Sequence, residues 1–122
     1  MKESGPSLYV SVRANTPREE YDTRKAADRL PRKREGDEPP VVNDESWPNE
    51  PGYVVRQRGG DGVRAELVRL HGREMLIVRA VWKNPKPPLS SPLGHPGQRV
   101  AYCERIARLI QDYEVQKLGW RE

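Results

Sequence analysis

The residues best suited to chemistry in this sequence are the arginines between Gly52 and Lys83. A guanidinium group is flat and permanently charged, and it suits bidentate contact with a phosphate or a carboxylate. A sheet that carries many of them predicts an anionic partner. The residues expected to bind nucleic acid or another partner are Arg56, Arg58, Arg64, Arg73, Arg79, Lys83 and Lys86, together with Tyr53, which would stack on a base.

A second interpretation uses apolar residues of the same region. If the N-terminal strand and helix leave one sheet face uncovered, that face exposes an apolar patch, and such patches usually mark interfaces. The residues expected at this interface are Val68, Met75, Ile77 and Val81, with Trp47 as a docking contact. The sequence thus predicts a non-enzymatic accessory protein that binds nucleic acid. The alternative, weighted about equally, is an adaptor or inhibitor that binds a protein, with a composition like that of small accessory proteins of mobile elements or phages.

Catalytic and metal-binding patterns are missing from the sequence. His71 and His95 lie in turns or loops without a partner at metal-ligand spacing. The RGGDG motif that begins at Arg58 is flanked by predicted strands, whereas phosphate-binding loops lead into a helix. Cys103 is the only cysteine, so no internal disulfide forms, and we expect it to be a small buried residue. No cofactor is predicted.

The sequence does not match the pattern of a metal-dependent nuclease. Metal-dependent nucleases place an acid on one strand, and an acid, a spacer and a lysine on the next. Asp61 and Glu66 would supply acids and Lys83 the lysine, but Val81 occupies the position of the second acid. We therefore expect that the protein is not an enzyme.

Charge divides the sequence near residue 50. Residues 1–50 hold nine Lys/Arg and eleven Asp/Glu, a net charge of −2, whereas residues 51–122 hold thirteen and seven, a net charge of +6. We expect a polar extension over 1–50 and a folded domain over 51–122. The excess positive charge lies on the predicted domain, which favours an anionic partner.

The extension contains three predicted segments. Leu8–Ala14 alternates like a strand, and Pro17–Leu30 is predicted to be a helix with a capping box of Thr16 and Glu19. Residues 31–50 are rich in proline and charge and predict an extended linker. No stretch approaches the roughly 18 apolar residues of a membrane span, and no signal peptide is evident, so we expect a cytoplasmic protein.

The folded domain is predicted to be a small antiparallel meander. A turn at His71–Gly72 would place Leu67 opposite Leu76 and Arg64 opposite Arg79. The strand at 53–58 follows a glycine-rich turn, and whether Tyr53 or Val54 faces the core is left open by the sequence. One face then gathers the core residues Val63, Ala65, Leu67, Leu76, Val78, Ala80 and Trp82.

A C-terminal helix completes the predicted domain. From Gln98 onward the apolar residues recur at helical spacing, and Gly119 marks the end. The fold class is therefore predicted as α+β: a meander of three strands, or four with Leu8–Ala14, covered by this helix and preceded by the polar extension.

Overall fold

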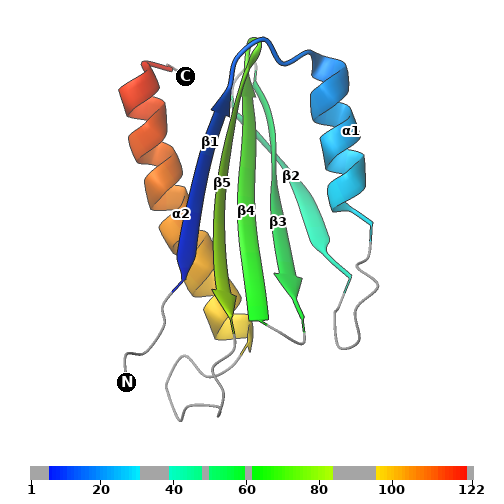
Figure 1. Ribbon diagram of the computed structural model, residues 1–122, viewed down its shortest axis with the longest axis vertical. Helices are drawn as coiled ribbons and strands as arrows, with labels where there is room; N and C mark the ends of the chain where they lie inside the picture. Colours follow the sequence, from blue (N-terminus) through cyan, green and yellow to red (C-terminus); the bar gives the residue numbers. More distant parts are fainter. Residues whose placement is uncertain (1–5, 31–38, 48–49, 60–61, 84–95, 121–122) are drawn as a thin grey trace.

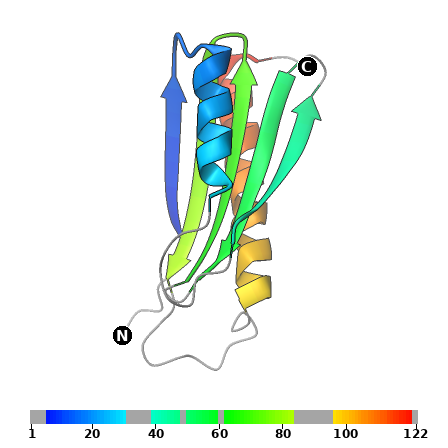
Figure 2. The same ribbon diagram turned by 90° about the vertical axis from the view of Figure 1, so that its right-hand side faces the viewer.

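The computed structural model has three layers, a five-stranded antiparallel sheet between two helices (Figures 1 and 2). It describes residues 6–30, 39–47, 50–59, 62–83 and 96–120. The elements along the chain are β1 (Ser7–Arg13), α1 (Arg18–Asp28), β2 (Val41–Trp47), β3 (Glu50–Arg58), β4 (Gly62–His71), β5 (Glu74–Lys83) and α2 (Pro96–Leu118). The α+β class and the C-terminal helix are confirmed.

The strand count was predicted too low. The sheet order is β1-β5-β4-β3-β2, so both edge strands come from the first 50 residues. Strand β2 lies inside the segment predicted to be a linker, because its polar residues Asn43, Asp44 and Glu45 hide the alternation expected of a strand. That residues 51–122 fold on their own stays a prediction.

The β4–β5 hairpin turns one residue later than predicted. His71 pairs with Glu74, so the loop is Gly72–Arg73, and Gly72 has a positive φ of 62° that glycine adopts without strain. Shifting a turn by one residue moves every partner by two positions, which preserves the face of each side chain. Leu67 therefore faces Val78 and not Leu76, but both predicted faces are correct.

The core beneath α2 contains every residue predicted for it. Cys103 and Ala107 from α2 pack on that sheet face together with Val54 from β3. Burial raises the pKa of the Cys103 thiol to about 11, so it stays protonated near neutral pH. The strand at 53–58 is now oriented, because Val54 lies on the α2 side and Tyr53 on the α1 side.

A second core lies under α1, on the face that was predicted to be an exposed apolar patch. Tyr21 of α1 packs on Tyr53 with ring centroids 5.6 Å apart, and Val68, Met75 and Ile77 are buried around them. The patch was expected only if the N-terminal strand and helix left this face uncovered, but α1 covers it (Figure 2). The prediction that Val68, Met75 and Ile77 form an exposed interface is therefore wrong. Val81, near the end of β5, is half-buried.

The end of α2 follows a local backbone pattern, whereas the start of α1 is fixed by a contact with a distant segment. At the end of α2, Gly119 has a φ of 75°, its N–H donates to Gln116 and the N–H of Trp120 donates to Val115, which is a Schellman motif. The predicted capping box of α1 is wrong. Thr16 is buried, and its N–H donates to the carbonyl of Arg73 at 2.7 Å, tying the start of α1 to the β4–β5 hairpin.

In the ranges that the structure describes, neither helix is long and apolar enough to cross a membrane.

Truncation of Leu67 tests the α2-side core. Leu67 is fully buried, so Leu67→Ala should lower the free energy of unfolding by about 2–5 kcal/mol, as a cavity replaces packed methyl groups. Denaturant unfolding measures this loss. The matched control is Leu109→Ala on α2, where the side chain is 64% exposed and the change should stay within about 0.5 kcal/mol. Equal effects of the two substitutions would contradict the packing described here.

Candidate interaction surface

Most arginines of the sheet are engaged with carboxylates inside the molecule. On the α1 side the centre of these contacts is Glu66 of β4, which is completely buried. Its carboxylate accepts hydrogen bonds from Arg79 Nε at 2.7 Å, Arg24 Nη2 at 3.1 Å and Arg64 Nη1 at 3.4 Å. The predicted opposition of Arg64 and Arg79 is wrong, because the register places Glu66 across from Arg79.

Glu66 remains ionised despite its burial. Desolvation alone would raise the pKa of its carboxyl group, but Arg79, and then Arg24 and Arg64, outweigh burial and lower that pKa below the usual range of glutamate. Nearby, the Tyr53 hydroxyl donates to Asp28 Oδ2 at 2.7 Å, and burial of Asp28 raises its pKa. These contacts attach α1 to the sheet through a layer of charged and polar groups.

Arginines on the α2 side play a similar role. Arg56 donates to Glu104 of α2, with Nη2 to Oε2 at 2.9 Å, and Arg108 bridges Glu104 and Glu45 of β2. At the other end of this face the buried Arg69 donates to Glu50 at 2.6 Å. Arg56 and Arg108 thus join β3 and β2 to α2, and Arg69 joins β4 to β3.

The residues predicted to bind nucleic acid differ in their exposure and in the sheet face on which they lie. Arg58, Arg73 and Lys83 are exposed, and Arg79 is 36% exposed, but the Arg64 side chain is only 11% exposed. Arg56 lies on the opposite face from Arg64, beneath Glu104.

One further predicted contact, Tyr53, does not lie on this surface. Tyr53 is fully buried with its hydroxyl on Asp28, so the prediction that it stacks on a base is wrong. Lys86 and the side chain of Trp47 lie outside the described residues.

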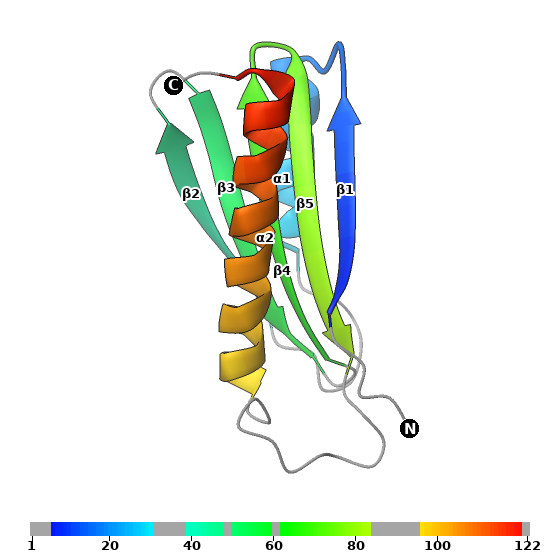
Figure 3. The same cartoon turned by 90° about the vertical axis from the view of Figure 1, so that its left-hand side faces the viewer.

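The exposed apolar surface is found instead on the edge strand β1. Leu8, Val10 and Val12, 43%, 45% and 41% exposed, point to the α2 side because they pair with Ala80, Val78 and Leu76 of β5. Neither helix covers β1 in Figures 2 and 3. Its outer edge has no paired strand within the described residues.

Helix α2 extends this apolar surface. Glu104 and Arg108 point from α2 toward β3 and β2, where their partners lie. Ile106 and Ile110 lie on the opposite side of the helix, since each is two positions, about 200°, from one of these residues. That side of α2 faces β5 and β1 (Figure 3). Together with Leu8, Val10 and Val12 of β1, the half-buried Ile106 and Ile110 of α2 define an apolar strip on this side of the sheet.

The other edge of the sheet is protected. Strand β2 carries Asn43, Asp44 and Glu45, and two of these are paired, Asp44 with Lys25 and Glu45 with Arg108. Charged side chains on an edge strand discourage the addition of another strand. Strand β1 has one charged residue, Arg13, at its end, and no proline within Ser7–Arg13, so it has little of this protection.

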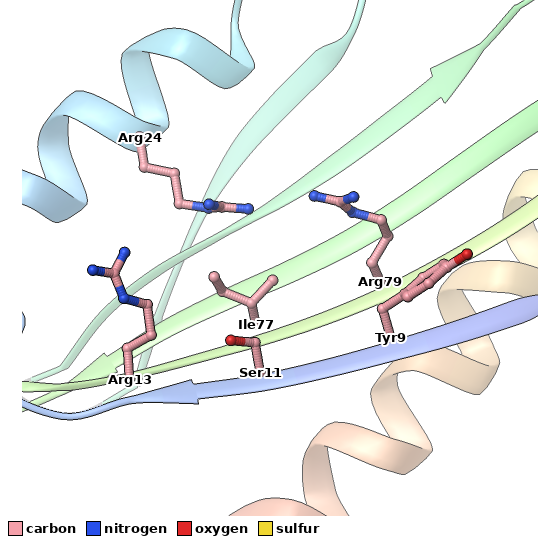
Figure 4. Close-up of a pocket in the computed structure, with 6 residues that line it drawn as sticks. All are labelled: Tyr9, Ser11, Arg13, Arg24, Ile77 and Arg79. Atoms are coloured by element: carbon pink, nitrogen blue, oxygen red, sulfur yellow. The ribbon is translucent and has the colours of Figure 1, made fainter.

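On the α1 side of β1 lies a pocket of about 250 Å³. Its lining residues are Tyr9, Ser11 and Arg13 of β1, Arg24 of α1, and Ile77 and Arg79 of β5. Figure 4 shows the three arginines reaching from these elements over Ile77 and Ser11. The two sides of β1 therefore differ, one being apolar and the other cationic.

The strand at 8–14 was predicted from the sequence, but none of its residues was predicted to contact a partner. The alternation that predicted the strand also assigns its residues to two faces, so the chemical difference between the faces was predictable. The two sets are Leu8, Val10 and Val12, and Tyr9, Ser11 and Arg13. Its position at an edge, and the approach of Arg24 from α1, depend on contacts between distant parts of the chain.

Comparison with protein-family models, curated proteins and solved structures gave no match. Within the described residues, no three metal-ligating side chains of His, Cys, Asp or Glu gather at one place.

Neutralising Glu66 tests the charged layer under α1. Glu66→Gln should lower the free energy of unfolding by about 3–5 kcal/mol at pH 7, because it leaves partly buried guanidinium groups without their carboxylate. The folded pKa of Glu66 lies below the unfolded value of about 4.3, so its contribution is present above that pH. It is lost as the pH falls through the folded pKa, and the difference between wild type and variant should shrink there.

The control for this experiment is Glu20→Gln. Glu20 pairs with Arg13 at 2.8 Å, but both side chains are exposed, so the loss should be about 0–1 kcal/mol. Denaturant unfolding at several pH values gives both quantities. A Glu66→Gln loss as small as that of Glu20→Gln, or one independent of pH, would refute the role given to Glu66.

Proposed function

We propose that the protein is a non-catalytic interaction module that binds an extended segment of a partner protein by adding it as a strand beside β1. The observation that carries this proposal is the contrast between the two sheet edges. Strand β2 is polar and ion-paired, whereas β1 exposes Leu8, Val10 and Val12 beside an edge to which none of the described strands pairs. Exposed edges of this kind recruit strands in several peptide-binding domains.

Two contributions to the affinity of an added strand are available at β1: backbone hydrogen bonds and burial of apolar side chains. Backbone groups along the outer edge of β1 supply hydrogen bonds that do not depend on the partner's sequence. Alternate side chains of the added strand would pack on the apolar strip between β1 and α2, which gives affinity through burial. This keeps the predicted adaptor function but moves its surface from Val68, Met75 and Ile77 to β1.

A matched pair of substitutions tests this proposal. Peptides are selected from a random display library on the wild-type protein, and their affinities are measured for Val10→Lys and Val41→Lys. These valines lie on opposite edge strands and are 45% and 53% exposed. Val10→Lys removes apolar contact worth about 1.5 kcal/mol or more, so affinity should fall at least tenfold.

Val41→Lys should leave peptide affinity unchanged. Hydrogen exchange of the wild-type protein should show that bound peptide slows the β1 amides and not those of β2. The proposal fails if no peptide is selected, or if the selected peptides respond alike to the two substitutions.

Nucleic-acid binding is the second candidate, and the net charge of +6 over 51–122 favours it. Arg58 and Lys83, both exposed, end β3 and β5 at the same end of the sheet. A gel-shift assay with single- and double-stranded oligonucleotides at about 50 mM salt tests this candidate. Binding should weaken with salt and on joint Arg58→Glu and Lys83→Glu substitution, equally for all sequences. No shift at micromolar protein would exclude the candidate.

A further inference from the structure

Strand β1 presents two chemically different rows of side chains to any strand that pairs with it. Leu8, Val10 and Val12 point to the α2 side and are apolar. Tyr9, Ser11 and Arg13 point to the α1 side and line the cationic pocket. Because side chains alternate along a strand, an added strand must also send alternate residues to these two sides.

The described lining of the pocket is cationic. Arg13, Arg24 and Arg79 line it, and no acidic residue is among its lining residues. Arg24 and Arg79 share the carboxylate of Glu66, which is buried, and Arg13 pairs with the exposed Glu20. A carboxylate entering from the open side would therefore meet guanidinium groups, two of which share one buried partner.

An added strand brings its side chains within reach of this pocket. Neighbouring strands lie about 4.7–4.9 Å apart, so an added strand would be about 5 Å from β1 and about 10 Å from β5. Arg13 pairs with Met75 and Arg79 pairs with Tyr9, so the two arginines lie four positions apart along β1. One acidic residue on the α1 side of the added strand would lie beside Arg13, and another, four positions away, would face Arg79 across Tyr9. Tyr9 and Ser11 add hydroxyl donors on the same side.

We propose that β1 binds a partner segment in which apolar residues alternate with acidic ones. The acidic side chains would bind in the pocket lined by Tyr9, Ser11, Arg13, Arg24, Ile77 and Arg79. The inference depends on the proposed strand addition and specifies the chemistry of the partner. The apolar residues occupy the strip beside α2, and the carboxylates bind the arginines on the α1 side.

A second copy of this chain fits the edge less well. Strand β1 contains no carboxylate between Ser7 and Arg13. Antiparallel pairing of two copies about a two-fold axis would place two Arg13 and two Arg79 side chains on one face of the combined sheet. Like charges on neighbouring strands repel, whereas an acidic strand neutralises them.

Three capped seven-residue peptides test this inference. In each, valine alternates with a second residue, which is glutamate in the first peptide, glutamine in the second and lysine in the third. The glutamate peptide should bind about tenfold more tightly than the glutamine peptide at low salt, since two partly exposed ion pairs contribute on that scale. The lysine peptide should bind most weakly, and at about 1 M salt the three affinities should converge. Calorimetry or fluorescence anisotropy provides the affinities.

Substitutions in the full chain locate the effect. Arg13→Gln should reduce the preference for glutamate over glutamine severalfold while leaving the affinity for the glutamine peptide unchanged. The Arg13 side chain is 53% exposed, so this variant should remain folded. Arg79→Gln should reduce the preference further, with unfolding measured in parallel because Arg79 also binds Glu66. The matched control is Arg58→Gln, an exposed arginine on the α2 side of β3, which should change nothing.

The outcomes separate this inference from the proposed function. If the three peptides bind with equal affinity, and Val10→Lys weakens all of them, strand addition stands and the acidic preference is refuted. If none binds, while library peptides of another pattern bind at β1, the acidic preference is again refuted. If sedimentation shows a dimer that Val10→Lys dissociates and the glutamate peptide does not, the occupant of the edge is a second copy.

Discussion

The buried carboxylate of Glu66 is the group on which the arrangement of the α1 layer depends. It lies in the middle strand of the sheet, with no exposed surface, and three guanidinium groups from α1, β4 and β5 converge on it. A buried charge is tolerated only when partners replace the water it has lost. Arg24 is one of these partners, so ionisation of Glu66 and the position of α1 are coupled.

The two helices are held in different ways. Helix α2 covers its face with Val100, Cys103, Ala107 and Val115, and burial of apolar surface is the main stabilising term there. Helix α1 buries one apolar side chain, Tyr21, and relies otherwise on directional contacts to the sheet. Directional contacts fix a position sharply but stabilise little beyond the cost of desolvation. They hold Arg24 at the wall of the pocket beside β1.

The arginine content of the sheet has a structural explanation that comes before any functional one. Arg56 contacts Glu104 of α2 and so joins two layers, whereas Arg69 and Arg79 contact Glu50 and Glu66 on neighbouring strands of the sheet. Three arginines, Arg13, Arg24 and Arg79, also line the pocket on the α1 side of β1. The functional proposals follow from that position, because an edge strand exposes both its faces and its backbone to a partner.

The sequence by itself determined the parts of the structure that depend on local periodicity. Strands alternate and helices repeat at 3.6 residues, so both faces of the β4–β5 hairpin, the strand at 8–14 and both helices were predictable. The hairpin register was less so, because turns at His71–Gly72 and Gly72–Arg73 give the same faces. Strand β2 escaped prediction because its polar edge residues carry no alternating apolar signal.

Only the tertiary structure decided which arginine meets which carboxylate and which strand lies at an edge. Arg24 and Glu66 are 42 residues apart, and Arg108 and Glu45 are 63 apart. Nothing local in the sequence distinguishes a paired arginine from one that binds a partner, because the guanidinium chemistry is the same in both. Strand order sets the environment of each charge, and the sequence contains strand order only through long-range packing.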